Sequence, residues 1–451
     1  MRKLVAVGAA VLLGVVLAGC TGRDAPPAAG GTRSPSPGRV TSAATPDPVT
    51  LRFAVYGARP VVAAYRELAR AFTQHHPRVS VDVEVAHDPH SAMETLREEL
   101  SDGDAPDVFL VEHEALPAMV RAGQVHPVDQ LLERRGVSFG DNYQRVGLEA
   151  FSADSALQCM PHDVSPFVVY YNEDLVKPGR ASPRDLQPSA RAGWTWPSFV
   201  ATARAASHDG VKGVYLPPTL PALAALVRSA GGEVMNDPRR PTTLTLSEEN
   251  TRQPLEQVLA LARDDDLTPT RGQLRRHGAV GLFERGRLAM MLGGRALLPE
   301  LREVKGLRFD VMPLPGPGRV GTLSSTTGYC IAAGTPHLRA AADFLAFAIS
   351  REGAAITTRT GYVVPANLAV LHSPAFTQPG QEPEHAFVYI ESLRQSASPP
   401  FVPGWTDLQE QVRPLLDRLF HTEAANVQPL LSRIDQRSRA VLRSRGTQPA
   451  A

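Results

Sequence analysis

Two carboxylate side chains follow a continuous apolar run in the first third of the chain. Glu112 and Glu114 come directly after Val108–Val111, a run typical of a strand buried on both faces. A carboxylate pair could act as general acid and base on a glycosidic bond, or it could accept hydrogen bonds from the hydroxyl groups of a solute. Both charges could also stabilise the N-terminus of a following helix. No GxSxG, HExxH or P-loop motif accompanies the pair, so we expect a binding protein and not an enzyme.

The remaining candidate motifs do not indicate a metal ion or a nucleotide. The dipeptide His-Glu that begins at His113 would open a zinc motif, but Pro117 stands where the second histidine is required. Gly316–Gly321 matches GxGxxG, but Pro317 spoils the turn and the segment does not join a strand to a helix. Asp264–Asp266 is typical of a solvated helix end rather than a calcium loop. The sequence therefore predicts no metal and no cofactor.

The ends of strands must position the side chains that bind a solute. In residues 50–122, β-rich segments alternate with helical apolar stripes, which predicts a parallel, doubly wound α/β lobe. A second α/β stretch follows at 167–312. Open sheets of this kind bind ligands at the carboxyl ends of their strands. That rule selects Tyr56 and Arg59 in the first lobe, and in the second lobe it selects Arg295, which follows a pair of glycines.

Length and charge narrow the class of protein further. A chain of 451 residues exceeds one ordinary core, so we expect two domains. The formal net charge is +1, and removal of an N-terminal leader that holds two basic residues would leave 45 basic against 46 acidic residues, or −1. A charge so close to zero, with scattered arginines, argues against a nucleic-acid partner. The apolar patterns also predict a short strand at 242–246 and an amphipathic helical tail at 405–442.

The N-terminus has the pattern of an export signal. Two basic residues precede an apolar segment, Leu4–Val16, that is shorter than a membrane span. Small residues then lead to Cys20, which predicts a signal peptide at 1–19 and acylation of the cysteine, as in a bacterial lipobox. Residues 20–48 are rich in Pro, Gly, Ser and Thr without a hydrophobic period, so we expect a flexible tether. The body would then lie at the extracytoplasmic face of the cell membrane, held through its lipid anchor only.

Short motifs with a fixed order run through the folded part. In chain order they are Tyr65–Leu68, Gly103–Val108, Pro161–Val164, Tyr170–Leu175, Thr195-Trp196, Gly231-Gly232, Phe283–Met290, Pro313–Gly316, Ala342–Leu345 and Gly361–Pro365. Together, behind the lipobox and tether, they resemble the extracellular solute-binding proteins of carbohydrate ABC importers, the family related to maltose-binding protein. The resemblance spans about 49–442.

This resemblance implies a periplasmic-binding-protein-like fold in which two doubly wound α/β lobes are joined by hinge crossovers. The lobes implied are 49–160 with 320–365 and 164–316 with 370–445, and the crossovers would fall near 160–165, 311–324 and 364–371. The function implied is capture of a sugar or sugar-like solute in the cleft and its delivery to an ABC permease by a monomer. The alternatives are a receptor for a membrane sensor and a secreted glycosidase.

Ligand-binding residues are expected at the strand ends and the crossovers. The candidates are Tyr56, Arg59, Glu112, Glu114, Asp163, Arg295, Thr326, Thr327, Tyr329 and Trp405. Carboxylates and guanidinium groups suit hydroxyl groups, and aromatic rings suit the C–H face of a sugar. Tyr56 could instead only pack in the core, and Asp163 could instead only fix the hinge turn. Arg295 stands where the family often has an aromatic residue, which leaves room for a sugar acid or a polyol phosphate as well as a neutral sugar.

Two cysteines remain once lipidation uses Cys20. Cys159 and Cys330 would lie in a compartment that permits disulfides, and the resemblance places both near crossing segments. A disulfide between them and two buried thiols are both compatible with the sequence.

Overall fold

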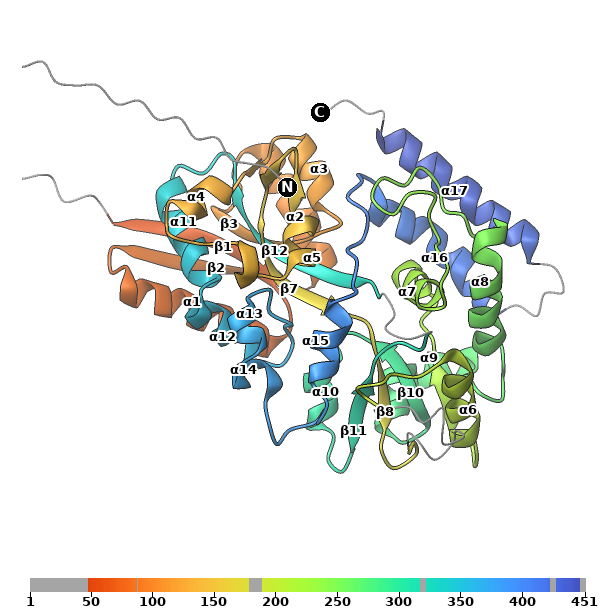
Figure 1. The fold of residues 1–451 in the computed structure, drawn as a ribbon. Helices are drawn as coiled ribbons and strands as arrows, with labels where there is room; N and C mark the ends of the chain where they lie inside the picture. The colour runs from red at the N-terminus through yellow and green to blue at the C-terminus, as the bar shows by residue number, and fades with distance from the viewer. Residues whose placement is uncertain (1–47, 87, 178–188, 317–321, 422–426, 447–451) are drawn as a thin grey trace, which may run out of the picture. The chain divides into compact units, whose positions relative to one another are not determined.

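The computed structural model describes residues 48–86, 88–177, 189–316, 322–421 and 427–446. These residues belong to one compact unit, Asp47–Ala451, in which two main β-sheets form the centres of two lobes (Figure 1). The expected signal peptide, Cys20 and nearly all of the tether lie outside the described residues.

The first sheet is built around three parallel strands. β1 (Val49–Tyr56) pairs with β2 (Val79–Ala86) on one side and with β3 (Val108–Glu112) on the other. β12 (Ser324–Ala332) then runs antiparallel beside β3 and also pairs with β4 (Val125–His126). The parallel order expected for the first half of this lobe is confirmed, and the sheet gains an antiparallel strand from a distant part of the chain.

Helices connect the parallel strands and bury their apolar stripes against the sheet. α1 (Arg59–His75) buries Leu68 and Phe72 among other residues. Asp88 caps the N-terminus of α2 (Pro89–Asp102), because its carboxylate accepts hydrogen bonds from two N–H groups of the first turn. The other helices that contribute to this core are α3 (Leu116–Arg121), α4 (Asp129–Glu133), α5 (Arg145–Ala150), α11 (Leu338–Ala348) and α12 (Arg351–Thr358).

The second sheet has the order β11-β8-β10-β9. β10 (Leu288–Gly293) runs parallel to β9 (Lys212–Tyr215), but β8 (Val168–Asn172) is antiparallel to both β10 and β11 (Phe309–Met312). The second lobe therefore has a mixed sheet in which β8 runs antiparallel to its neighbours. β8 follows the crossing strand β7 (Met160–Pro166) after a single residue. The direction of β8 is therefore set by the chain as it enters the lobe, because no β-α-β connection precedes this strand.

Helices surround the second sheet in two groups. One group shares a core with β9 and consists of α6 (Trp196–Ala206), α7 (Leu220–Ser229), α8 (Glu249–Ala262), α16 (Trp405–His421) and α17 (Gln428–Gly446). The other lies toward β11 and consists of α9 (Arg271–Glu284), α10 (Leu298–Glu303), α13 (Leu368–Leu371), α14 (Pro374–Thr377) and α15 (Phe387–Leu393).

Two expectations for this lobe are corrected. The tail expected as one helical stretch at 405–442 forms two helices, α16 and α17, and residues 422–426 between them are not described. The segment 242–246 forms no strand, apart from one isolated bridge at Leu244. Two backbone N–H groups of this segment donate to side chains of α17 and not to a neighbouring strand. Ser438 accepts from the N–H of Leu244 at 2.7 Å, and Asp435 accepts from the N–H of Leu246 at 2.9 Å.

Three chain segments cross between the lobes side by side. β7 pairs antiparallel with β12, and on its other side the N–H of Val164 donates to the carbonyl of Val364. The N–H of Ala366 likewise donates to the carbonyl of His162. A bridge between Asp163 and Pro365 completes this narrow layer.

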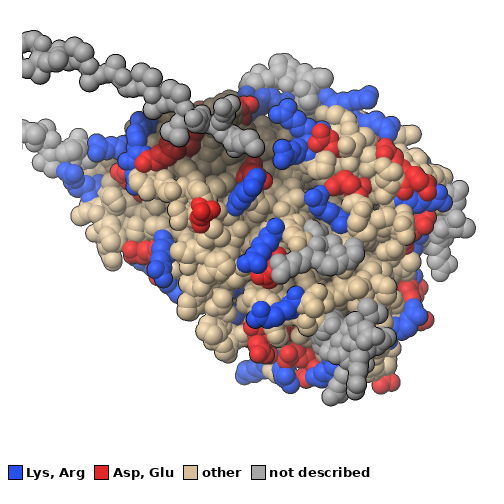
Figure 2. All heavy atoms as spheres, in the orientation of Figure 1, with Lys and Arg blue, Asp and Glu red and all other residues tan. Residues whose placement is uncertain are grey.

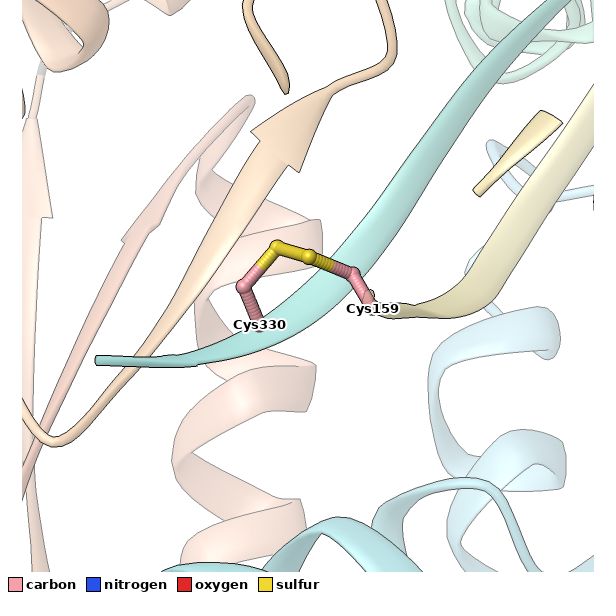
Figure 3. Close-up of a disulfide and its surroundings, with 2 residues drawn as sticks. All are labelled: Cys159 and Cys330. Carbon is pink, nitrogen blue, oxygen red and sulfur yellow. A yellow bond between two sulfur atoms is a disulfide. The ribbon is translucent and has the colours of Figure 1, made fainter. Parts of the chain in front are cut away.

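A disulfide joins Cys159 and Cys330 at the first-lobe end of these crossings (Figure 3). Cys159 directly precedes β7, Cys330 lies in β12, and the two Cα atoms are 4.5 Å apart. The bond therefore ties the strand that leaves the first lobe to the strand that returns to it. On the molecular face shown in Figure 2, basic and acidic side chains are interspersed over the surface.

Candidate functional site

A cavity of about 440 Å³ lies where the two lobes and the crossing segments meet. This volume is within the range of small-molecule sites. The cavity is lined by Glu112, Glu114, Phe167, Thr219, Leu220, Pro221, Leu323, Ser324, Ser325, Pro399, Thr406, Gln409, Glu410 and Arg413. The lining thus combines first-lobe carboxylates, crossing residues and two helices of the second lobe.

The wall from the first lobe consists of the carboxylates at the end of β3. Glu112 is the last residue of the strand and pairs with Thr327 of β12, and Glu114 follows two residues later. Burial raises the pKa of Glu112. Burial and, after it, the charge of Glu112 raise the pKa of Glu114 to about 7. Neither carboxylate forms an ion pair with a Lys, Arg or His among the described residues.

The second lobe contributes lining residues from α7 and α16. Thr219 caps α7 by accepting a hydrogen bond from the N–H of Ala222, and this cap fixes where the helix begins at the cavity. Thr406, Gln409 and Arg413 repeat at helical spacing, so they project from one side of α16. This second-lobe wall therefore offers a hydroxyl, an amide and a guanidinium group to a solute.

Crossing residues complete the lining. Leu323 directly precedes β12 and Phe167 directly follows β7, so the two lie at the same end of this strand pair. The N–H of Phe167 donates to the carbonyl of Leu323, and both residues line the cavity with apolar side chains. Ser324 bonds to the hydroxyl of Ser396, while the neighbouring Ser325 is exposed. Apolar carbon beside hydroxyl groups is the combination that the two faces of a sugar ring require.

Two of the ten residues expected to bind a ligand line the cavity, namely Glu112 and Glu114. Four others are at least nine-tenths buried, and each has a side-chain polar atom without a hydrogen-bond partner among the described residues. These four are Tyr56, Thr326, Tyr329 and Trp405. Trp405 and Thr326 are chain neighbours of lining residues. Arg59 is exposed at the start of α1, and Thr327 is half-buried in β12.

Asp163 lies in the crossing layer and not in the lining. Its carboxylate accepts a hydrogen bond from the N–H of Val364 at 2.6 Å. Burial raises the pKa of Asp163 to about 7, although the backbone hydrogen bond and the charge of Arg295 act in the opposite direction. The contact matches the alternative in which this residue fixes the hinge.

Arg295 is fully buried and does not line the cavity. One guanidinium nitrogen donates to the carbonyl of Phe376 at 2.8 Å. The guanidinium carbon lies 4.0 Å from the ring centroid of Phe376 and 5.2 Å from that of Tyr389, so aromatic faces stabilise its charge. The cavity therefore receives no anion-binding group from Arg295.

Sequence reasoning missed most of the second-lobe wall. Thr219 follows β9 closely, so the rule for strand ends could have found it. Gln409 and Arg413 lie on a C-terminal helix that packs against α7 through tertiary contacts. No local pattern in the sequence distinguishes their side of α16 from its other exposed positions.

Two α/β lobes, three crossing segments and a cavity where they meet define the class of two-lobed solute-binding proteins. Residues 67–384 match the model of a family described as bacterial extracellular solute-binding protein. The match covers more than half of the chain, which therefore belongs to this family. The expected two-lobed α/β fold is thereby confirmed, and membership indicates a location outside the cytoplasm. No described helix is long and apolar enough to cross a membrane.

Solved structures share this fold at low sequence identity. The ABC substrate-binding protein Lmo0181 from Listeria monocytogenes, in complex with cycloalternan, is 20% identical with a TM-score of 0.76, over 87% of this chain and 99% of that one. The sugar-binding protein MalE from Xanthomonas citri is 18% identical with a TM-score of 0.76, over 88% and 98%. The GacH receptor of Streptomyces glaucescens, studied with acarbose, is 17% identical with a TM-score of 0.72, over 88% and 98%. No curated protein sequence matches the chain.

Proposed function

We propose that the chain is the substrate-binding subunit of an ABC importer and that it binds a saccharide in the cavity between its lobes. One observation carries the proposal: carboxylates of the first lobe and polar side chains of α16 line the same cavity. A solute that contacts both walls stabilises the arrangement in which they face each other, which is how a ligand drives closure of hinged lobes. The saccharide ligands of the similar structures support this class of solute.

Delivery requires that the body stays near a permease. The expected acylation of Cys20 and the tether at 20–48 would hold a monomeric body at the membrane. The protein acts by binding and release, without chemistry on the solute. Replacement of Cys20 by Ala should move the protein out of the membrane fraction, and unchanged lipid labelling of that variant would contradict the anchor.

A thermal-shift screen tests the binding function directly. The probes are neutral saccharides, amino saccharides, sugar acids and polyol phosphates, because a solute that binds only the folded state raises its stability by about 2.7 kcal/mol at a hundred times its Kd. Titration calorimetry then measures the Kd of each hit. If no probe raises the melting temperature, saccharide binding is refuted for these classes.

A matched pair of variants tests the position of the site. Gln409 lines the cavity, whereas Gln411 is exposed on the same helix outside it. Gln409→Ala should weaken binding by about 1 kcal/mol, the usual contribution of one hydrogen bond, and Gln411→Ala should leave the Kd unchanged. Equal effects of the two substitutions would place the site elsewhere.

A further inference from the structure

The ionisable groups of the cavity are unevenly distributed in sign. Three carboxylates line it, Glu112 and Glu114 from β3 and Glu410 from α16, whereas Arg413 is its only cationic side chain among the described residues. Glu410 and Arg413 form no ion pair within the described part of the chain. With all four groups ionised, the lining carries an excess of two negative charges.

Among the described residues, no cation forms an ion pair with either carboxylate of the first-lobe pair. Burial raises the pKa of the Tyr56 phenol at the end of β1, and the charges of Glu112, Glu114 and Asp163 act in the same direction, so three carboxylates are within electrostatic range of this group. The charge of Arg295 acts on Asp163, but the guanidinium group itself contacts the carbonyl of Phe376 and the rings of Phe376 and Tyr389. Within the described part of the chain, the first-lobe wall therefore presents two carboxyl groups that have no cationic partner.

We propose that the solute carries a protonated amine and that the cavity is specific for amino saccharides. This inference rests on the proposed function, because it names the solute class of the same cavity. An ammonium group between Glu112 and Glu114 forms charge-assisted hydrogen bonds and relieves the repulsion between the two carboxylates. Its three donors match the acceptor-only carboxylates, while the ring hydroxyl groups face the amide and hydroxyl groups of α16 and α7.

The same electrostatics disfavour the anionic solutes that Arg295 suggested at the level of sequence. A sugar acid or a polyol phosphate would add a negative charge next to buried carboxylates, which costs free energy unless a cation accompanies it. The volume of about 440 Å³ lies toward the small end of the range for ligand sites, so a short saccharide fits better than a long chain. The raised pKa of Glu114 agrees with a site that lacks positive charge.

Titration calorimetry with matched probes tests the inference. The probes are glucosamine, galactosamine and the disaccharide of glucosamine, each compared with its N-acetylated form and with the neutral sugar that has a hydroxyl group in place of the amine. At neutral pH we expect at least one amine to bind tenfold or more tightly than both of its counterparts. Glucuronic acid should bind most weakly of all.

Carboxylate variants assign the preference to the cavity. Glu112→Gln and Glu114→Gln should each reduce the preference for the amine to less than threefold, because glutamine keeps the shape of the side chain but not its charge. The control, Glu98→Gln, makes the same chemical change at an exposed position of α2 and should retain the full preference. Thermal unfolding of each variant verifies that it is folded.

The outcomes separate this inference from the function on which it rests. Neutral or N-acetylated sugars that bind as tightly as the amines would overturn the amine specificity and leave the saccharide-binding function intact. An amine preference that persists in both Gln variants would overturn the assignment to Glu112 and Glu114. Absence of binding by every probe would overturn the proposed function together with the inference.

Discussion

The carboxylate of Asp163 accepts a hydrogen bond from the backbone N–H of Val364, and this contact connects the first and third segments that cross between the lobes. A buried charge at this position is costly, because burial raises the pKa of Asp163 from 3.8 to about 7. The folded state therefore retains a proton that the unfolded state releases above about pH 4. It follows that this group lowers the free energy of unfolding as the pH rises from about 4 to about 7.

Substitution of Asp163 separates its charge from its hydrogen bond. Asp163→Asn keeps an oxygen that can accept from Val364 and removes the titration, so its free energy of unfolding should decline less than that of the wild type between pH 5 and pH 7.5. Asp163→Ala leaves the N–H without its acceptor and should cost about 1–3 kcal/mol. Urea unfolding at each pH measures both effects. Identical pH profiles for the wild type and the Asn variant would contradict the titration.

The disulfide should stabilise the protein by constraining the unfolded chain. It links Cys159 to Cys330 across 171 residues of sequence, a span that includes the whole of the second sheet. Reduction, or replacement of both cysteines by Ala, should lower the free energy of unfolding by about 2–4 kcal/mol. Intact mass with and without reductant establishes whether the bond is present. The Ala variant is the control, because reductant should not change its melting temperature.

Acid should destabilise the protein through a buried histidine. His113 is fully buried, its ring lies edge-on to Phe151 and Phe401, and burial lowers its pKa to about 4. The unfolded state binds a proton below about pH 6.5 that the folded state does not take up until near pH 4. This group therefore lowers the stability as the pH falls through that window, by about 2–4 kcal/mol in total.

His113→Phe retains an aromatic ring and removes the titration. Its loss of stability between pH 6.5 and pH 4.5 should be smaller than that of the wild type, as measured by urea unfolding. His162, whose ring nitrogen contacts the hydroxyl of Tyr65 at 3.2 Å, continues to titrate in both proteins, because burial lowers its pKa to about 3. The difference between the two profiles therefore reports His113 alone, and profiles that run parallel would argue against its titration.

Local patterns in the sequence predicted the elements of the fold well. The alternation of β-rich and helical segments at 50–122 predicted the parallel order of β1, β2 and β3, because such periodicity depends on neighbouring residues. The direction of β8 and the absence of a strand at 242–246 depend on β7 and α17, which are remote in the sequence. Such effects leave no local periodicity that could be detected.

The site was predicted in part for the same reason. Glu112 and Glu114 follow from the rule that binding residues lie at strand ends, and they line the cavity. Arg295 obeys the same rule but is buried against Phe376 and Tyr389, which approach it from 81 and 94 residues further along the chain. Composition cannot distinguish an arginine that faces a solute from one that faces two aromatic rings.

Because Arg295 is buried, its substitution should reduce the stability of the protein and leave the affinity for a solute nearly unchanged, whereas substitution of a residue that contacts the solute should do the reverse. Arg295→Met removes a buried cation, its aromatic contacts and its hydrogen bond to the carbonyl of Phe376. The free energy of unfolding should fall by about 2–4 kcal/mol, while the Kd for a bound saccharide changes less than threefold. Arg413→Gln, in the cavity lining and exposed, should show the reverse pattern. If Arg295→Met weakens binding without loss of stability, Arg295 is a ligand contact.

The affinity for an amino saccharide should depend on pH with two limbs. The pKa of Glu114 is raised to about 7 in the protein without solute, and only the ionised carboxylate attracts an ammonium group. Affinity should therefore rise as the pH increases from about 6 to about 7. Above about pH 8 it should fall again, because a sugar amine, like an α-amino group with a pKa of about 7.7–8.0, loses its proton. Titration calorimetry in two buffers of different ionisation enthalpy should also detect protons released on binding near pH 6.5.

Glu114→Gln provides the decisive comparison for the lower limb. The variant has no carboxylate to protonate at this position, so its affinity for the amine should be weaker than that of the wild type at pH 7 and nearly constant between pH 6 and pH 7. The upper limb belongs to the solute and should persist. The N-acetylated sugar has no titrating amine and should show no upper limb with either protein. If the wild type binds the amine equally well at pH 6 and pH 7, the ionisation of Glu114 does not control recognition.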